Sequence, residues 1–196
     1  VTVQLSIGRD EGFDDDGEVA ATVTATAGSV SDSSKVNWTS ENPINAGDVT
    51  IGEHSWVWPT AVLRGDNGPI IVGARTSVQD GTIVHTIPSS PTTIGDEVTV
   101  GHNAHLEGCR IANRALIGSG SIVLHHAEVG EEALVGAGAL VGNNKSVPAQ
   151  ARALGIPAVI TEGVASYEQW ASGVDTYVEK ARWYHETLRV IGPTAP

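Results

Sequence analysis

The feature that most constrains this chain is an aliphatic residue that recurs every six positions between residues 48 and 147. The period matches neither the 3.6 residues of a helix nor the two residues of a half-buried strand. Glycine often follows the aliphatic residue directly, as in Ile117-Gly118 and Val135-Gly136. The recurring residues are Ile51, Val57, Leu63, Val72, Val78, Val84, Ile94, Val100, Leu106, Ile111, Ile117, Val123, Val129, Val135, Val141 and Val147. The repeat therefore indicates a solenoid rather than a β-sandwich.

A six-residue repeat of this kind is typical of a parallel β-helix. Each repeat forms one flat side of a triangular prism with its aliphatic residue inside, and three repeats close a coil of about eighteen residues. Composition agrees, because the 196 residues include 23 glycines, one phenylalanine and no methionine, too few large side chains for a thick layered core. We predict an all-β solenoid, a left-handed parallel β-helix of hexapeptide repeats, over residues 47–160.

The two ends of the chain follow other patterns. Residues 1–46 lack the repeat, and we expect them to form an irregular N-terminal arm. Residues 161–196 include apolar positions at three- and four-residue spacing, such as Val174, Val178 and Ala181, which predict a helix over about residues 174–190. We expect this C-terminal α-helix to pack back on the β-helix.

Charge and cysteine usage exclude several classes of protein. The 23 acidic residues outnumber the 11 basic ones and give a net charge of −12, which makes nucleic acid an unsuitable partner. A single cysteine, Cys109, excludes an intrachain disulfide and a multi-cysteine metal site, and we expect it to be a small buried residue. No apolar run approaches the roughly 18 residues of a membrane span, and no signal peptide opens the chain. The expected location is the cytoplasm.

Three interruptions of the repeat indicate where a site lies. The spacing is nine between Leu63 and Val72, ten between Val84 and Ile94, and five between Leu106 and Ile111. Regular repeats build the scaffold, whereas interrupted ones are expected to form loops and redirect side chains. All three interruptions fall within residues 64–110, so we place the candidate site there.

Counting coils brings polar residues together. Residues three repeats apart stack at about 4.8 Å, so Arg64, His85 and Glu107 are expected to form one outward-facing column. The same count places Asp80 beneath His102, on a different side of the prism. Since solenoids of this kind commonly trimerise, different sides meet at each subunit boundary. Two ligands from one chain and one from the next could then surround one metal ion.

Three segments resemble the gamma-class carbonic anhydrase family: residues 55–66, 77–85 and 98–104. The matching motifs are Arg64-Gly65-Asp66, Gln79-Asp80-Gly81, His85 and His102, and the resemblance covers about residues 47–190. It implies a homotrimer whose interfaces hold three active sites. It also implies zinc, or alternatively iron or cobalt, in each site, and the reversible hydration of carbon dioxide to bicarbonate.

The resemblance implies that His85 and His102 are metal ligands. The third ligand of the family pattern falls five residues after the second, where this chain has Glu107 instead of histidine. Two histidines and a glutamate are a known catalytic zinc set, so the implied set is His85, His102 and Glu107. His105 lies nearby but does not stack on His85, and it ranks second as the completing ligand.

The resemblance implies further roles. Gln79 would orient the metal-bound hydroxide, Arg64 and Asp66 would link subunits near the site, and Asp80 would support a ligand from behind. Tyr177 would bind water, with plain packing as the equal alternative.

Two other functions remain open from the sequence. One is a non-catalytic trimeric binding or assembly module that has lost a ligand at Glu107. The other is a hexapeptide acyltransferase with a histidine general base, although the matching residues follow the anhydrase pattern. His125, one coil above Glu107, is expected either to lie at the surface or to shuttle protons.

Overall fold

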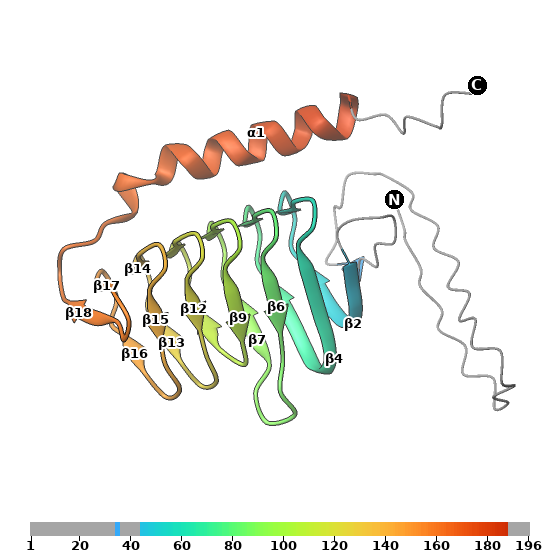
Figure 1. Ribbon diagram of the computed structural model, residues 1–196. Coiled ribbons are helices and arrows are strands. Elements are labelled where there is room, and N and C mark those ends of the chain that lie inside the picture. Colours follow the sequence, from blue (N-terminus) through green and yellow to red (C-terminus); the bar gives the residue numbers. More distant parts are fainter. Residues whose placement is uncertain (1–33, 36–43, 188–196) are drawn as a thin grey trace, which may run out of the picture.

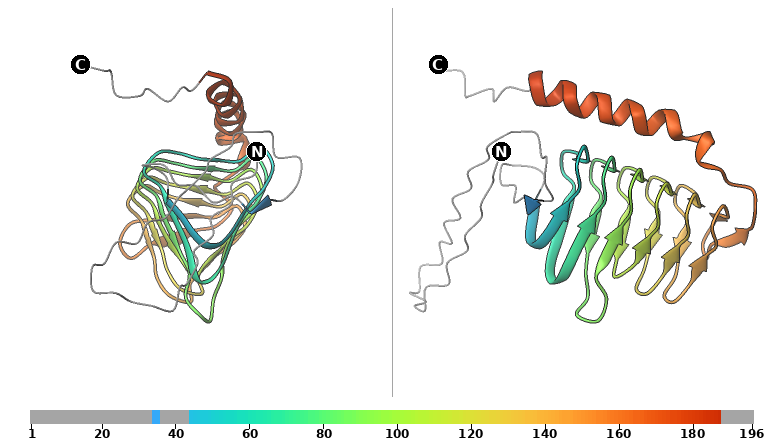
Figure 2. Two further views of the ribbon diagram at one scale, coloured as in Figure 1. Left: turned by 90° about the vertical axis from the view of Figure 1, so that its right-hand side faces the viewer. Right: turned by 180° about the vertical axis from the view of Figure 1, so that it is seen from behind.

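The computed structural model describes residues 34–35 and 44–187, and it confirms the predicted solenoid with a helix along one side (Figure 1). Seen end-on, the coils have a triangular outline (Figure 2). Strand β1 (Ser34–Lys35) pairs antiparallel with β2 (Ile44–Ile51), so the first coil begins a few residues before the predicted boundary. Most of the predicted N-terminal arm, residues 1–33 and 36–43, lies outside the described residues.

Each six-residue repeat contributes one short strand to one side of the prism. One side carries β6 (Ile83–His85), β9 (His105–Glu107), β12 (Ile122–Val123) and β15 (Leu140–Val141). The second carries β7 (Thr92–Ile94), β10 (Arg110–Ile111), β13 (Glu128–Val129) and β16 (Ser146–Val147). The third carries β3 (Trp56–Val57), β5 (Ser77–Val78), β8 (Thr99–Val100), β11 (Leu116–Ile117), β14 (Leu134–Val135), β17 (Arg152–Leu154) and the antiparallel β18 (Val159–Thr161).

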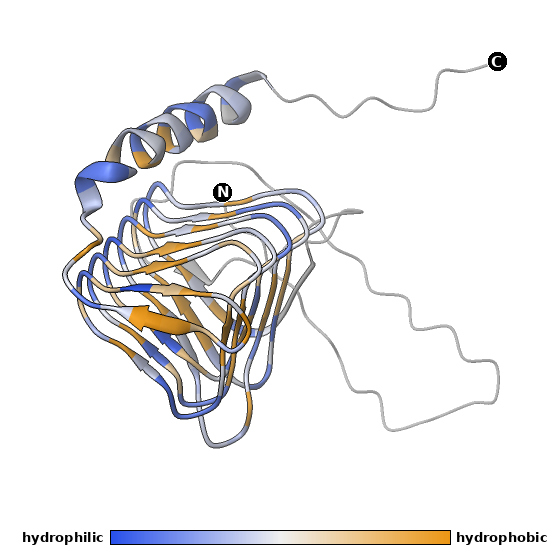
Figure 3. Cartoon of the chain, turned by 60° about the vertical axis from the view of Figure 1, so that its left-hand side comes forward, coloured by the Kyte–Doolittle hydropathy of each residue, from blue (hydrophilic) through white to orange (hydrophobic). Residues whose placement is uncertain are grey.

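The aliphatic residues of the repeat form the core, as predicted. Leu63, Val84, Leu106 and Val123 stack on successive coils and are completely buried. Only Val57 among the recurring residues is partly exposed. Figure 3 shows hydrophobic segments alternating with polar turns on every coil. Because each aliphatic side chain packs on the coils before and after it, the core is one continuous row along the prism axis.

The first interruption does not form the loop that we expected. Residues 62–72 are one continuous strand, β4 (Val62–Val72), which turns the corner and contributes to two sides of the prism. The two ends of the strand pair in parallel with β2, while Leu63 aligns with Val84 on β6 and Val72 aligns with Ile94 on β7. Between them the register with β2 shifts, and residues 66–69 have no partner on β2, so the extra residues form a bulge in the strand.

The other two interruptions change the shape of a corner. Residues 86–91 form the protruding loop that the ten-residue spacing predicts, closed by a bridge between Ile87 and Ser90 (Figure 1). The five-residue spacing places Gly108 at a tight corner with φ of +58°, a backbone region that favours glycine. This shortened corner directly follows Glu107, so it helps to determine where that side chain points.

Helix α1 (Ala171–Thr187) follows a short 3₁₀ helix η1 (Tyr167–Gln169) and lies along the side of the prism that carries β3 and β5. Val174, Val178 and Ala181 are buried, which confirms the apolar side predicted from their spacing. The helix begins three residues before the predicted start. No helix within residues 34–35 and 44–187 is both long and apolar enough to cross a membrane.

One corner of the prism carries stacked charges, which we call the corner ladder: Arg75, Glu97, Arg114 and Glu132. Arg75 Nε lies 3.1 Å from Glu97 Oε1, and Arg114 Nε lies 3.1 Å from Glu132 Oε1. Arg75 also pairs with Asp175 of α1 at 2.7 Å. The ladder therefore ties the coils to one another and to the helix.

Candidate metal centre

The polar column expected from the repeat is present. Arg64, His85 and Glu107 occupy matching positions on β4, β6 and β9, three neighbouring strands of one side. His85 Nδ1 lies 3.0 Å from Glu107 Oε1, which confirms that these two side chains are neighbours. His85 is mostly buried, with 12% of its side chain exposed. The imidazole is therefore held with one ring nitrogen directed at a carboxylate.

The second ring nitrogen of His85 faces Asp66. His85 Nε2 lies 3.1 Å from Asp66 Oδ1, and Arg64 Nη1 donates to Asp66 Oδ2 at 2.7 Å. The hydrogen bond from Arg64 holds the pKa of the Asp66 carboxyl below its ordinary value, and the contact with His85 acts in the same direction against a desolvation effect. Arg64 and Asp66, predicted to link subunits, thus also form a chain that ends on His85.

Glu107 lies at the centre of a group that we call the Glu107 cluster: Glu107, His85, His105 and His125. His105 Nε2 lies 3.2 Å and His125 Nε2 lies 3.4 Å from the same oxygen, Glu107 Oε2. Burial raises the pKa of Glu107, but the three histidine contacts outweigh burial and hold that pKa below its ordinary value. The carboxylate is therefore favoured in its charged form, the form that binds a metal.

His102 lies at a different corner, in the turn between β8 and β9. Its Nδ1 is 3.0 Å from Asp80 Oδ2, which confirms the predicted carboxylate beneath it. About half of the His102 side chain is exposed. Gln79, the residue before Asp80, is buried with 4% exposed. With its Nδ1 facing Asp80, His102 has Nε2 left to bind a ligand.

One chain does not complete a three-ligand centre. Within residues 34–35 and 44–187, no three His, Cys, Asp or Glu side chains are arranged to hold a metal ion. His85 and Glu107 face each other, but His102 belongs to another corner and pairs with Asp80. A centre with these three ligands therefore needs a second copy of the chain.

Two further residues lie outside the polar column or join it unexpectedly. Tyr177, for which water binding and plain packing were equal alternatives, packs its ring on Trp58 with the centroids 5.9 Å apart. The sequence also missed Asn67, whose Nδ2 lies 3.4 Å from His85 Nε2. Asn67 directly follows Asp66 in the bulged segment of β4, and both side chains lie beside the same ring nitrogen of His85. The nine-residue spacing between Leu63 and Val72 is the signal that could have found it.

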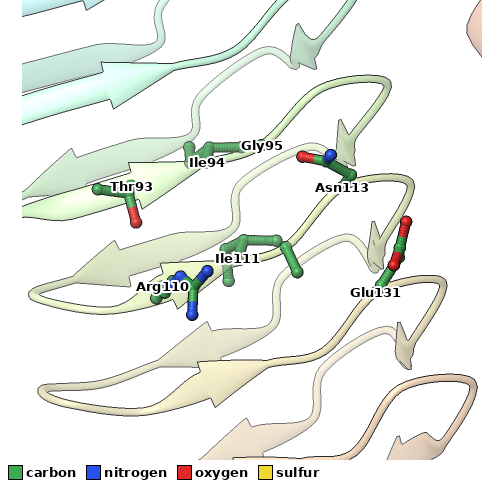
Figure 4. A pocket seen from close by; sticks show the side chains of 8 residues that line it. Thr93, Ile94, Gly95, Arg110, Ile111, Asn113 and Glu131 are labelled. Carbon is green, nitrogen blue, oxygen red and sulfur yellow. The ribbon is translucent and has the colours of Figure 1, made fainter.

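Two other features can be separated from this site. Burial raises the pKa of Cys109 to about 12, and the residue is 2% exposed, as expected of a packed rather than a nucleophilic cysteine. An open hollow on the second side of the prism is lined by Thr93, Arg110, Asn113 and Glu131 among others (Figure 4). None of the candidate metal ligands lines this hollow.

Comparisons with known proteins agree with the repeat. Residues 108–143 match the family model described as bacterial transferase hexapeptide (six repeats). The solved structure of a hexapeptide transferase family protein from Anaplasma phagocytophilum is similar, with a TM-score of 0.69 and 35% identity. That similarity covers 73% of this chain and 86% of the Anaplasma chain.

Two curated relatives have more specific names. A carbonic anhydrase of Geobacillus kaustophilus is 41% identical over 140 residues, which are 70% of this chain and 77% of that protein. Gamma carbonic anhydrase 2 of Arabidopsis thaliana, a mitochondrial protein, is 42% identical over 109 residues. Those residues are 53% of this chain and 39% of the Arabidopsis protein.

Proposed function

We propose, from the premise that this chain belongs to the gamma-class carbonic anhydrase family, that it catalyses the reversible reaction of carbon dioxide and water to bicarbonate and a proton. The site would lie between the subunits of a homotrimer. The observation that carries the proposal is the contact between His85 Nδ1 and Glu107 Oε1, at two positions where the family pattern has metal ligands.

The donor set fits a divalent metal ion. We propose that His85 and Glu107 of one chain and His102 of a neighbouring copy hold zinc, or alternatively iron or cobalt. Ligand bonds of about 2.0–2.2 Å in a tetrahedral zinc site place two ligand atoms about 3.3 Å apart. The facing atoms of His85 and Glu107 are 3.0 Å apart, close to that separation. Two imidazoles and one carboxylate also leave a fourth position open.

The ion would supply Lewis-acid chemistry that lowers the pKa of water toward about 7. Glu107 brings a negative charge where the family pattern has a neutral imidazole, so it would weaken that acidity and slow hydration at neutral pH. Asp80 would keep a proton on Nδ1 of His102 and so direct Nε2 outward. The chain's own residues thus favour a working but slow enzyme.

Other residues would orient the reactants and the subunits. We assign to the buried Gln79 the role of orienting the attacking oxygen by hydrogen bonding. Arg64 and Asp66 would connect neighbouring subunits next to His85. Tyr177 packs on Trp58, so a role in binding site water would need a contact in addition to this packing. The second candidate function, a non-catalytic trimeric module, is favoured by one observation, the carboxylate at position 107.

Metal content is the first test. The trimer is purified without added metal and without air, and its metal is measured by elemental mass spectrometry. We expect one zinc, iron or cobalt per chain. A metal-free trimer that also does not bind added zinc would rule out the anhydrase proposal and leave the non-catalytic module.

The variant Glu107→His tests catalysis itself. Restoring the imidazole removes the negative charge from the donor set, so kcat/KM for carbon dioxide hydration should rise about tenfold or more. Stopped-flow hydration assays measure this, with His126→Asn as a control because His126 is exposed and, among the described residues, its side chain has no ion pair or hydrogen bond with a proposed ligand. An unchanged rate in a metal-loaded Glu107→His trimer would point to a function other than hydration.

A further inference from the structure

The proposed function uses one oxygen of Glu107, and the structure gives the other oxygen two partners of its own. Oε1 faces His85, whereas Oε2 faces Nε2 of His105 at 3.2 Å and Nε2 of His125 at 3.4 Å. His105 comes from the same strand as Glu107, two residues earlier, and His125 comes from the turn of the next coil. Oε2 therefore has two imidazole nitrogens beside it, one at hydrogen-bond distance and one at ion-pair distance.

His125 is the less expected of the two partners. A strict six-residue count places Leu124, not His125, above Glu107. The His125 side chain is only 34% exposed, and its Nε2 is shielded from solvent. In the described part of the chain this nitrogen makes no hydrogen bond. It does lie within ion-pair distance of a carboxylate oxygen, Glu107 Oε2. Shielded polar atoms are usually paired, so the placement of this nitrogen requires an explanation.

The chemistry of a carboxylate that binds a metal explains why a histidine nitrogen would lie beside Oε2. A carboxylate that binds a metal through one oxygen has a second oxygen free, and partners on that second oxygen orient the ligand and tune its basicity. Glutamate has several rotatable bonds, so an unsupported Glu107 would sample many orientations. Contacts on Oε2 restrict those orientations and leave Oε1 turned toward His85.

We propose that His105 and His125 are positioning residues for Glu107, holding Oε2 so that Oε1 is presented to the metal. This inference rests on the proposed function, because it takes Glu107 as a ligand. With a metal ion on Oε1, a small turn of Glu107 would bring Oε2 within hydrogen-bond reach of His125 Nε2. Neither histidine needs to touch the metal or the substrate.

The experiment measures cobalt binding rather than catalysis. The full-length trimer is stripped of metal, and its Co(II) affinity is measured by competition with a chelator, together with the visible absorption spectrum of the Co(II)-loaded protein. His125→Ala should lower the affinity about 10–100-fold, the usual effect of losing a residue that supports a ligand. It should also shift the Co(II) absorption bands, because the carboxylate ligand is less ordered.

Two matched variants separate positioning from simple packing. His125→Gln keeps an N–H group near the place of Nε2, so it should recover most of the affinity and the spectrum. His126→Asn changes the adjacent, exposed histidine at a turn position with φ of +58°, which asparagine tolerates, and it should leave both unchanged. His105→Ala removes the other partner of Oε2 and should also weaken binding, which keeps the test decisive if His125→Ala fails to fold.

The outcomes distinguish this inference from the proposed function. If the wild-type trimer binds one Co(II) per chain, and His125→Ala and His105→Ala bind it with unchanged affinity and spectrum, the positioning role is wrong while the metal site stands. If the wild-type trimer binds no cobalt at all, both proposals fail together. If His125→Gln is as weak as His125→Ala although both stay folded, packing rather than the N–H group is responsible and the inference is overturned.

Discussion

In the corner ladder, Arg75 meets Glu97 and Arg114 meets Glu132, so each permanent cation faces a permanent anion one coil away. In the Glu107 cluster, one carboxylate faces three imidazoles, two on the neighbouring coils and one, His105, on its own strand. Both groups are produced by the same stacking of coils. They differ in the residue types that the repeat presents at each corner.

The difference separates a structural contact from a site that can bind. Alternating permanent charges satisfy one another, and the ladder is further tied to α1 through Asp175. Imidazoles are weaker partners for a carboxylate, since each can donate, accept or bind a metal through its two nitrogens. The Glu107 cluster therefore has ligand capacity that the ladder lacks.

The largest expected effect comes from the core beneath the cluster. Leu106 is completely buried on the inner face of the strand that carries Glu107. Leu106→Ala should lower the free energy of unfolding by about 2–5 kcal/mol because it leaves a cavity in the row of aliphatic residues. Chemical denaturation measures the loss, with Ile122→Ala as the control, since Ile122 is 39% exposed. Equal losses for the two variants would mean that the buried aliphatic residues do not stabilise the strands that carry Arg64, His85 and Glu107.

Removing one glutamate from each group in turn tests the comparison directly. Glu107→Ala should lower metal affinity at least about 100-fold, because losing a ligand costs more than losing a supporting partner. Glu97→Ala removes a carboxylate from the ladder and should leave metal affinity unchanged. Both affinities are measured by chelator competition on the metal-free trimer. A comparable loss in Glu97→Ala would contradict the division between the two groups.

The ladder should respond in the opposite way, through stability. Glu97→Ala removes the partner of Arg75 and should lower the free energy of unfolding by about 1 kcal/mol at low salt. In about 1 M salt the loss should shrink, because the Debye length falls to about 3 Å. Denaturation at two salt concentrations measures this. A loss that does not depend on salt would show that packing, and not charge, makes the ladder stable.

The smallest effect is the pH dependence of Glu107 in the metal-free protein. Its pKa is lower in the folded chain than its ordinary value of 4.5, so the unfolded chain takes up the proton first as the pH falls. The stabilising contribution is fully present above about pH 4.5 and is lost as the pH falls through the lower, folded-state pKa. Thermal unfolding should be measured between about pH 6 and about pH 3, which spans that transition. Glu107→Gln should lose less stability on acidification than wild type does. If the two proteins lost stability equally as the pH fell, Glu107 would not contribute to the acid sensitivity.

The repeat predicted the fold and part of the site. Period six placed the aliphatic residues inside, and the count of three repeats per coil placed Glu107 beside His85 and Asp80 beside His102. It did not predict that β4 runs unbroken through the first interruption, where the extra residues form a bulge between two segments that pair with β2. It placed His125 one coil above Glu107 but did not predict that its Nε2 lies beside Glu107 Oε2, because that contact is offset from the regular stacking by one residue.

The sequence alone determined which residues point inward and which share a column, because a solenoid converts spacing along the chain into distance in space. The tertiary structure decided how the polar side chains pair. Corner geometry, the φ of Gly108 and the path of β4 direct those side chains, and none of these is a property of spacing alone. For this reason Glu107 could be placed next to His85 from the sequence, whereas the partners of its second oxygen required the folded coils.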